Sequence, residues 1–279
     1  MNRFLTVIFA SVLQMFSCKG NKAESGKDEV PVDSDSIAEA AATDTMEKLI
    51  AETPMPKAAD ELFDDFFFNF AASRSLQKKR IKFPLPVIKG NEVDSIQKSK
   101  WKTEHFFMRQ GYYTLIFDNK KQMDLVKDTT VGHVIVEKVY FSIKTVKQYV
   151  FNRINGLWML CEIHIKPLYQ NNNASFLKFY QRFAEDSLFQ LNSLDDPIKF
   201  TGPDPDDDFS QKESVITRDM WPDFASELPS GMIYNIIYGK TYEEKTYKIF
   251  VIRGISNGME VEMTFRRKDG KWLLTELTA

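Results

Sequence analysis

The sequence predicts an α+β fold in two tandem domains, each a helical segment followed by an antiparallel sheet. A hairpin pattern occurs twice, as Phe151–Ile163 and as Phe265–Leu277, and its two tryptophans lie 272 − 158 = 114 residues apart, about one domain's length. An aromatic stripe with helical spacing precedes each copy, and segments with strand character lie between the stripe and the hairpin. Helices first and an antiparallel meander afterwards indicate α+β rather than alternating βαβ units.

The composition fits a globular protein and argues against nucleic acid as a partner. The 279 residues include 37 basic and 39 acidic residues, so the net charge of −2 leaves no basic surface for a polyanion. The 23 phenylalanines allow each half to bury a core despite its modest size.

The first 18 residues are typical of a bacterial export signal. Asn2-Arg3 supplies a positive start, and an apolar run from Phe4 to Phe16 follows; its 13 residues are too few to span a bilayer. The pair Ser17-Cys18 at its end resembles the lipobox of bacterial lipoproteins, in which the cysteine is acylated and becomes the mature N-terminus. This resemblance implies lipid attachment at Cys18 and a place in the bacterial cell envelope, on the periplasmic side or at the cell surface. Ordinary cleavage nearby, with an incidental cysteine, is the alternative.

Residues 19–57 are predicted to be a disordered tether. The stretch from Lys19 to Ser36 is polar and contains almost no large apolar residues, so it cannot bury enough surface to offset the entropy of ordering. The alanine-rich stretch that follows favours a transient helix, which Pro54 and Pro56 would end.

Each half then opens with an amphipathic helix. Ring residues recur at positions i, i+3, i+4 and i+7, which places them on one face. The first stripe is Phe63, Phe66, Phe67 and Phe70, and the second is Phe176, Phe179, Tyr180 and Phe183. We expect these helices to run on to Gln77 and Gln190.

Strands are predicted after each helix from β-branched and aromatic content. In the first half they are Tyr112–Phe117, Val131–Phe141, Tyr149–Arg153 and Trp158–Ile165. Their counterparts in the second half are Met232–Tyr238, Lys248–Ile252, Glu260–Arg266 and Trp272–Leu277.

A phenylalanine-rich helix followed by a sheet that ends in Asn/Asp-Gly-x-Trp-x-Leu resembles the nuclear transport factor 2-like (cystatin-like) superfamily. The motif begins at Asn155-Gly156 in the first half and at Asp269-Gly270 in the second. The resemblance implies two cone-shaped domains, residues 58–168 and 174–279, in which a curved sheet wraps around a helix and often leaves a pocket at its open end. Tandem copies behind a lipobox also resemble bacterial envelope lipoproteins of unknown function. Because the superfamily includes isomerases, dehydratases and pure binding modules, the fold alone indicates no activity.

The candidate pocket residues are Glu162 and Glu276, with Trp158 and Trp272. Strand alternation places each glutamate on the face of its tryptophan. If that face lines the cone, each half holds one carboxylate in an apolar pocket, where burial would raise its pKa and suit it to general acid–base chemistry. The preferred alternative is a glutamate beyond the helix cover, solvated or ion-paired.

The hairpin turns also predict which residues face each other across the strands. With a two-residue turn, Arg153 lies opposite Trp158, and Arg267 lies opposite Trp272. We interpret this repeated pair as a cross-strand cation–π contact rather than as an anion receptor. The same register places Tyr149 opposite Glu162.

No residue is assigned a catalytic role, and no metal or cofactor is predicted. His105, His133 and His164 lie on separate elements without ligand spacing. Cys161 is expected to be a small buried hydrophobe, because Leu160 and Ile163 lie beside it in the sequence. A lipidated Cys18 could not pair with it, so no intramolecular disulfide is expected.

The preferred hypothesis is a non-enzymatic, lipid-anchored envelope protein that binds a small apolar or amphipathic ligand or a partner protein. Its membrane contact would be made through the lipid anchor. The alternatives are an isomerase- or dehydratase-type enzyme that uses a pocket glutamate as general base, and a structural scaffold in which the two sheets pack face to face.

Overall fold

The computed structural model describes residues 60–225, 227–239 and 246–279. The predicted signal peptide with Cys18 and the predicted tether lie outside the described residues. Residues 60–170 are called the first half below, and residues 171–279 the second half.

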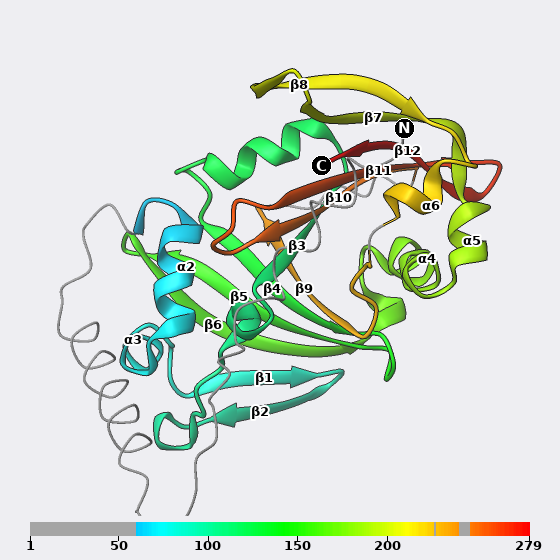
Figure 1. Cartoon of the computed structure of the whole chain (residues 1–279). Coiled ribbons are helices and arrows are strands. Elements are labelled where there is room, and N and C mark those ends of the chain that lie inside the picture. Colours follow the sequence, from blue (N-terminus) through cyan, green and yellow to red (C-terminus); the bar gives the residue numbers. More distant parts are fainter. Residues whose placement is uncertain (1–59, 226, 240–245) are drawn as a thin grey trace, which may run out of the picture. The chain divides into compact units, whose positions relative to one another are not determined.

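One 12-stranded mixed sheet runs through both halves, in the order β2-β1-β6-β5-β4-β9-β3-β10-β11-β12-β7-β8 (Figure 1). The first half supplies β1 (Leu85–Lys89), β2 (Glu92–Ile96), β3 (Tyr112–Phe117), β4 (His133–Tyr140), β5 (Thr145–Ile154) and β6 (Leu157–Pro167). The second half supplies β7 (Leu194–Asp204), β8 (Asp207–Ile216), β9 (Met232–Tyr238), β10 (Tyr247–Gly254), β11 (Glu260–Lys268) and β12 (Lys271–Thr278).

Each half begins with two consecutive helices. They are α2 (Phe63–Ala72) and α3 (Arg74–Lys79) in the first half, and α4 (Ala174–Glu185) and α5 (Ser187–Leu191) in the second. Shorter helices connect the strands: η3 (Lys98–Lys100), η4 (Phe106–Arg109), η5 (Lys120–Lys127), η6 (Leu168–Gln170) and α6 (Trp221–Phe224).

The aromatic stripes are buried as predicted, with Phe179 only partly so. The helices do not continue unbroken to Gln77 and Gln190, however. Ser73 and Asp186 take extended backbone angles, and their side chains accept hydrogen bonds from the backbone N–H of Leu76 and Phe189, which starts α3 and α5 as new helices.

The centre of the sheet is built by an exchange of strands between the halves. Strand β3 pairs with β10 of the second half, and β9 pairs with β4 of the first half, both antiparallel. The two exchanged strands lie side by side and parallel. The predicted domain boundary falls in the connection between β6 and α4, yet the halves share one sheet where two separate sheets were expected. The sequence repeat does not reveal this, because an exchanged strand needs the same alternation as one paired within its own copy.

Two cores cover opposite faces of this central region. Along β10, Ile249 and Val251 belong to the core under α2, whereas Phe250 and Ile252 belong to the core under α4. The α2 core also takes Tyr234, Ile236 and Tyr238 from β9, so it contains side chains of both halves.

The strands of both hairpins pair as predicted near their turns, but farther from the turns both depart from the predicted register. Arg153 faces Trp158, and Arg267 faces Trp272. A β-bulge then inserts one extra residue into the second strand of each hairpin, Cys161 in β6 and Thr275 in β12. Cys161 is buried, as predicted.

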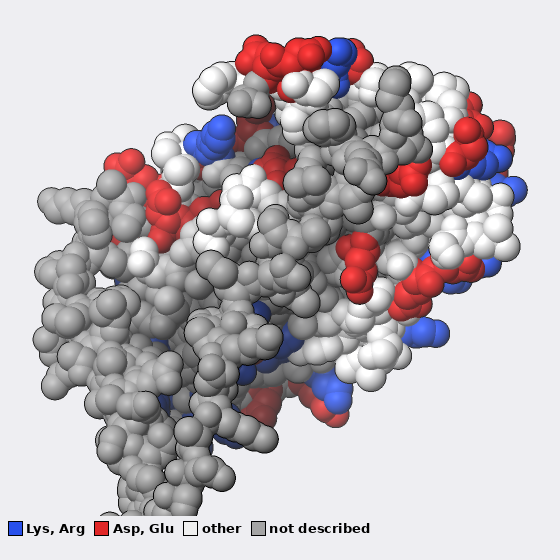
Figure 2. All heavy atoms as spheres, in the orientation of Figure 1, with Lys and Arg blue, Asp and Glu red and all other residues white. Residues whose placement is uncertain are grey.

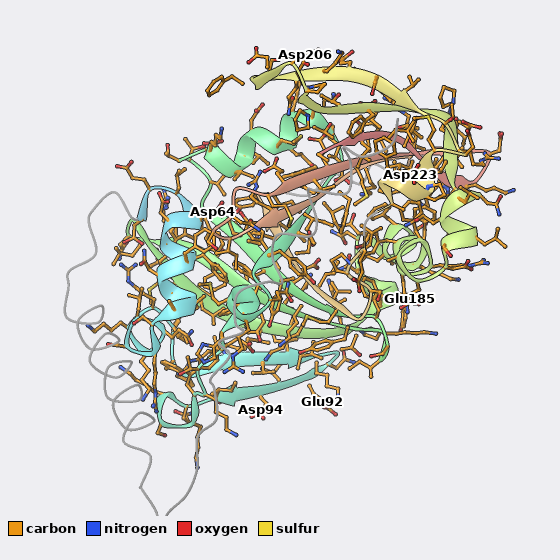
Figure 3. All side chains as sticks on the ribbon, viewed as in Figure 1. Asp64, Glu92, Asp94, Glu185, Asp206 and Asp223 are labelled. Carbon is orange, nitrogen blue, oxygen red and sulfur yellow. The ribbon has the colours of Figure 1, made fainter. Side chains whose placement is uncertain are left out.

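Four strands were not predicted from the sequence: β1, β2, β7 and β8. They form the two ends of the sheet, where β1 pairs parallel to β6 and β7 pairs parallel to β12 (Figure 1). Prolines and charged residues weaken their strand pattern. The turn between β7 and β8 carries acidic side chains that project into solvent, with Asp206 labelled there (Figures 2 and 3).

Candidate functional site

A group of charged and tyrosine side chains meets on the face of the sheet that α2 covers. It consists of Glu104, Lys138, Lys147, Tyr149 and Tyr234, and is called the Glu104 site below. The Tyr149 hydroxyl donates to Glu104 Oε2 at 2.6 Å, and the Tyr234 hydroxyl lies 3.5 Å from Oε1. Lys138 Nζ lies 3.7 Å from the same Oε1. The site therefore joins residues from β4, β5, β9 and the segment before η4.

Strand register and a buried glutamine hold these side chains in place. Lys138 on β4 lies directly opposite Lys147 on β5 and opposite Tyr234 on the exchanged strand β9. Gln77 of α3 fixes the backbone of Glu104, since its Nε2 donates to the Glu104 carbonyl at 2.8 Å and its Oε1 accepts from the Glu104 N–H at 3.1 Å. The exchange of strands is thus what brings Tyr234 to this site.

The site has a buried tyrosine floor and a partly open charged rim. Tyr149 and Tyr234 are buried, whereas the side chains of Lys138 and Glu104 are 18% and 23% exposed. Burial raises the pKa of Tyr234 to about 12, and burial together with the charge of Glu104 raises the pKa of Tyr149 further. Burial lowers the pKa of Lys147, and the charge of Lys138 acts in the same direction.

The second half shows that the fold does not require these residues. The strand pair Lys138 and Lys147 recurs 114 residues later as the pair Ile252 and Val261, which also face each other. The counterpart of Tyr149 is Met263, on the same spacing. Since apolar side chains fill these positions in one half, the strand geometry alone does not require charged residues in the other.

This contrast was present in the sequence as a difference between the copies, but sequence analysis did not identify the site. Strand prediction treats Lys138 and Lys147 as ordinary solvent-facing residues. Glu104 and Tyr234 lie 130 residues apart in sequence, and only the exchange of strands joins them.

A second polar cluster lies on the same face, and its Asp64 is labelled beside the start of α2 in Figure 3. The Asp64 cluster consists of Asp64, Tyr113, Tyr238, Arg253 and Glu260. The Tyr238 hydroxyl donates to Asp64 Oδ1, and Arg253 Nε donates to Glu260 Oε2 at 2.6 Å. Arg253 lies opposite Tyr113 on one side and opposite Glu260 on the other. Burial raises the pKa of Asp64, and burial with the charge of Asp64 raises the pKa of Tyr113 to about 12.

Replacing Asp64 by asparagine should increase stability relative to the wild type, and this difference should grow as the pH rises to neutral. The raised pKa means that the folded state keeps a proton which the unfolded chain releases near 3.8. Asp64 therefore lowers the stability of the wild type as the pH rises through this window, whereas an asparagine does not, and its amide oxygen still accepts from Tyr238. Urea unfolding of both proteins at several pH values measures this difference. Asp65→Asn, at an exposed neighbour, is the matched control, and a difference independent of pH would contradict the prediction.

The structure corrects the faces assigned to Glu162 and Glu276. The bulges shift the alternation by one residue, so that Ile163 faces Tyr149, where Glu162 was expected, and Leu277 faces Met263. Glu162 Oε2 lies 2.8 Å from His164 Nε2. The side chain of Glu162 is 44% exposed, and that of His164 is 35% exposed. Glu276 is 30% exposed and lies 3.7 Å from Arg266. Neither glutamate shares the face of its tryptophan.

Trp158 and Trp272 are buried in the two cores against the helical stripes. Trp158 contacts Phe63, and Trp272 contacts Phe176, each edge to face. The Arg153 guanidinium lies 4.9 Å from the Trp158 ring and also donates to the carbonyls of Asp60 and Thr129, which supports the structural interpretation of this pair. In the second copy Arg267 donates instead to the carbonyl of Gly270.

The described residues contain neither a cluster of metal ligands nor a membrane-spanning helix. Within residues 60–225, 227–239 and 246–279, no three histidine, cysteine or acidic side chains come together as metal ligands would. The same part of the chain contains no helix long and apolar enough to cross a membrane.

Comparison with known proteins gives a family but no activity. A family model for a domain of unknown function, DUF4348, matches residues 42–279. The crystal structure of a nuclear transport factor 2-like protein from Bacteroides fragilis is 41% identical, with a TM-score of 0.74, and the match covers 81% of this chain and 98% of that chain. No protein of curated function shows a significant match. The chain therefore belongs to the DUF4348 family and has a nuclear transport factor 2-like fold.

Proposed function

We propose that this protein is a non-enzymatic binding protein of the bacterial cell envelope, which holds a small amphipathic ligand at the Glu104 site. One observation carries the proposal: the site places the half-buried Lys138 and Lys147, beside the carboxylate of Glu104, where the other half has Ile252 and Val261. Burying charge lowers stability unless it is fully compensated. A protein that keeps such residues where the fold accepts apolar ones trades stability for function.

The surroundings of the site support an amphipathic ligand. Tyr140 lies two residues after Lys138 on the same face of β4, opposite Met232 of β9, and both side chains are only half-buried. An apolar part of a ligand would rest on these two side chains, next to the charged rim.

Native mass spectrometry of the full-length protein, purified gently from its own host, tests the proposal. We expect an extra mass that disappears on denaturation. The double variant K138I/K147V, which copies the second half, should lose this mass while it stays folded and unfolds at a denaturant concentration equal to or above that of the wild type, because two facing like charges are removed. Lys199→Val, at an exposed lysine of β7, is the matched control and should keep the ligand. A wild-type protein without any extra mass would contradict the proposal, as would a double variant that keeps it.

We also propose that the protein is anchored to the membrane by a lipid on Cys18. The proposal rests on the apolar run before Cys18, followed by a long polar stretch. Replacing Cys18 by serine should move the protein from the membrane fraction to the soluble fraction after cell breakage. Cys161→Ser, at the buried cysteine of β6, is the control and should stay in the membrane fraction. Membrane association that is unchanged in C18S would refute the anchor.

We further propose that the fold arose from two nuclear transport factor 2-like copies in tandem. The repeated hairpins, bulges and helical stripes support it, as does a repeated contact in which a tryptophan Nε1 donates to a glutamine. Trp101 donates to Gln77 at 3.0 Å, and Trp221 donates to Gln190 at 2.9 Å.

A further inference from the structure

We infer that the group recognised at the Glu104 site is an oxyanion, the carboxylate or phosphate of a small amphipathic molecule. The inference rests on the proposed function and names the chemistry of its ligand. It follows from the charges of the site, from the partners of each charged atom and from the half-buried side chains beside it.

The two lysines of the site face each other with too little negative charge between them. Lys138 and Lys147 are direct cross-strand partners, a position in which like charges repel. Among the described residues, Glu104 is the one carboxylate whose charge acts on both lysines, and its Oε1 lies 3.7 Å from Lys138 Nζ. Two ammonium groups against one carboxylate leave one positive charge uncompensated.

The carboxylate is already engaged elsewhere. Glu104 Oε2 accepts the short bond from Tyr149, and Oε1 is shared between Tyr234 and Lys138 at the longer separations of 3.5 and 3.7 Å. Glu104 therefore has its stronger hydrogen bond with a tyrosine, not with a lysine.

Among the described residues, none supplies the Lys147 ammonium with a hydrogen-bond acceptor. Within the described part of the chain its ammonium lies 4.7 Å from the Tyr149 ring and makes no hydrogen bond or ion pair. A half-buried ammonium with three N–H donors and no acceptor is costly unless something supplies one. An oxyanion between Lys147 and Lys138 would accept from both and would balance the charge of the site.

A carboxylate or phosphate also fits better than a neutral group. Hydrogen bonds between charged partners are stronger than those between neutral ones, and partial burial increases the difference. A cationic ligand would meet two ammonium groups at once. The half-buried Tyr140 and Met232 lie on the side of the site where the remainder of the molecule would extend.

Lysine side-chain NMR of the full-length protein in a non-ionic detergent tests the inference. The protein is labelled with ¹³C-lysine and titrated with inorganic phosphate and, separately, with octyl phosphate. We expect saturable shifts of the Lys138 and Lys147 signals, assigned with K138I and K147V. Lys248 is the internal control, because it is buried in a pair with Asp118 and should not respond. Lys147→Val should weaken phosphate binding by roughly tenfold or more, since it removes a charged donor.

The two probes distinguish the sources of the anion. Tighter binding of octyl phosphate than of phosphate identifies an amphipathic molecule, and equal binding identifies a free oxyanion. Titrations in which neither probe moves the Lys147 signal would overturn the inference. A wild-type protein whose native extra mass proves to be a neutral or cationic compound would also overturn it, yet would leave the proposed function standing. Saturable phosphate shifts in a protein without any native extra mass would support the oxyanion site and reject the proposed function.

Discussion

Neither half of this protein should fold as a monomer when it is expressed alone, whereas the two halves together should reconstitute the native structure. The core under α2 takes Tyr234, Ile236, Tyr238, Ile249 and Val251 from the second half. Burying such a side chain contributes about 1.5–3 kcal/mol, so together the five approach the whole stability of a typical domain, about 5–15 kcal/mol. A first half without them also exposes β3, which is buried on both faces.

The measurement is size-exclusion chromatography and circular dichroism of residues 58–170, residues 171–279 and their equimolar mixture. We expect each fragment alone to be unfolded or self-associated, and the mixture to form a folded one-to-one complex. A fragment that folds as a homodimer would agree with the prediction, because each copy could then supply the exchanged strand to the other. A folded, cooperatively unfolding monomer of either fragment would show that each half can close its sheet with its own β3 or β9, and would contradict the prediction.

A buried polar network lies at each of the two contacts between an exchanged strand and the other half, β9 with β4 and β3 with β10. Glu137 on β4 and Asn235 on β9 are direct cross-strand partners, and their side chains are hydrogen-bonded at 3.1 Å. At the other seam, Lys248 on β10 is paired with Asp118, which directly follows β3, and it also donates to Asn173 at 2.8 Å. Apolar contacts alone would allow a strand to pair with either copy. Buried hydrogen bonds penalise the wrong partner, because they would be left unsatisfied.

The sequence was most informative where local chemistry decides the structure. The Asn-Gly turn and the alternation around Trp158 placed Arg153 opposite that tryptophan, as found. Two exchanged strands, Tyr112–Phe117 and Met232–Tyr238, were predicted with the bounds that the structure gives them. These signals depend on neighbours within a few residues, which a single sequence contains.

The parts that could not be predicted depend on pairing between distant segments. A β-bulge adds one residue without changing the composition of the strand. The stretch from Trp158 to Glu162 therefore gives no sign that Glu162 lies on the opposite face from the tryptophan. The Glu104 site needs β9 of one half beside β4 of the other, and the repeat is equally consistent with unexchanged strands. Strand alternation therefore assigns Glu162 to a face of the hairpin that it does not occupy.

Replacing Glu137 by alanine should destabilise the protein by at least about 3 kcal/mol, because three buried amide groups would lose their acceptor. Glu137 is fully buried, and it accepts from Gln148 at 2.6 Å, Asn171 at 2.7 Å and Asn235 at 3.1 Å. Two of these donors belong to the second half, so the substitution acts on the seam between the halves. Urea denaturation followed by tryptophan fluorescence measures the loss.

Further variants around Glu137 distinguish whether hydrogen bonds or apolar packing hold β9 against β4. Glu162→Ala, at a half-exposed glutamate of the same sheet, is the matched control and should change stability by less than about 0.5 kcal/mol. The counterpart of Glu137 in the second half, 114 residues later, is Val251, so this strand position accepts an apolar side chain when its neighbours are apolar too. Glu137→Val combined with leucine at Gln148, Asn171 and Asn235 should therefore recover part of the stability that E137A loses, since the three amide donors are removed together with their acceptor. The recovery is partial because the N–H of Asn173 loses its acceptor, Asn171 Oδ1. An E137A protein as stable as E162A would show that packing alone holds β9 against β4, and the exchange would then need another explanation than its buried hydrogen bonds.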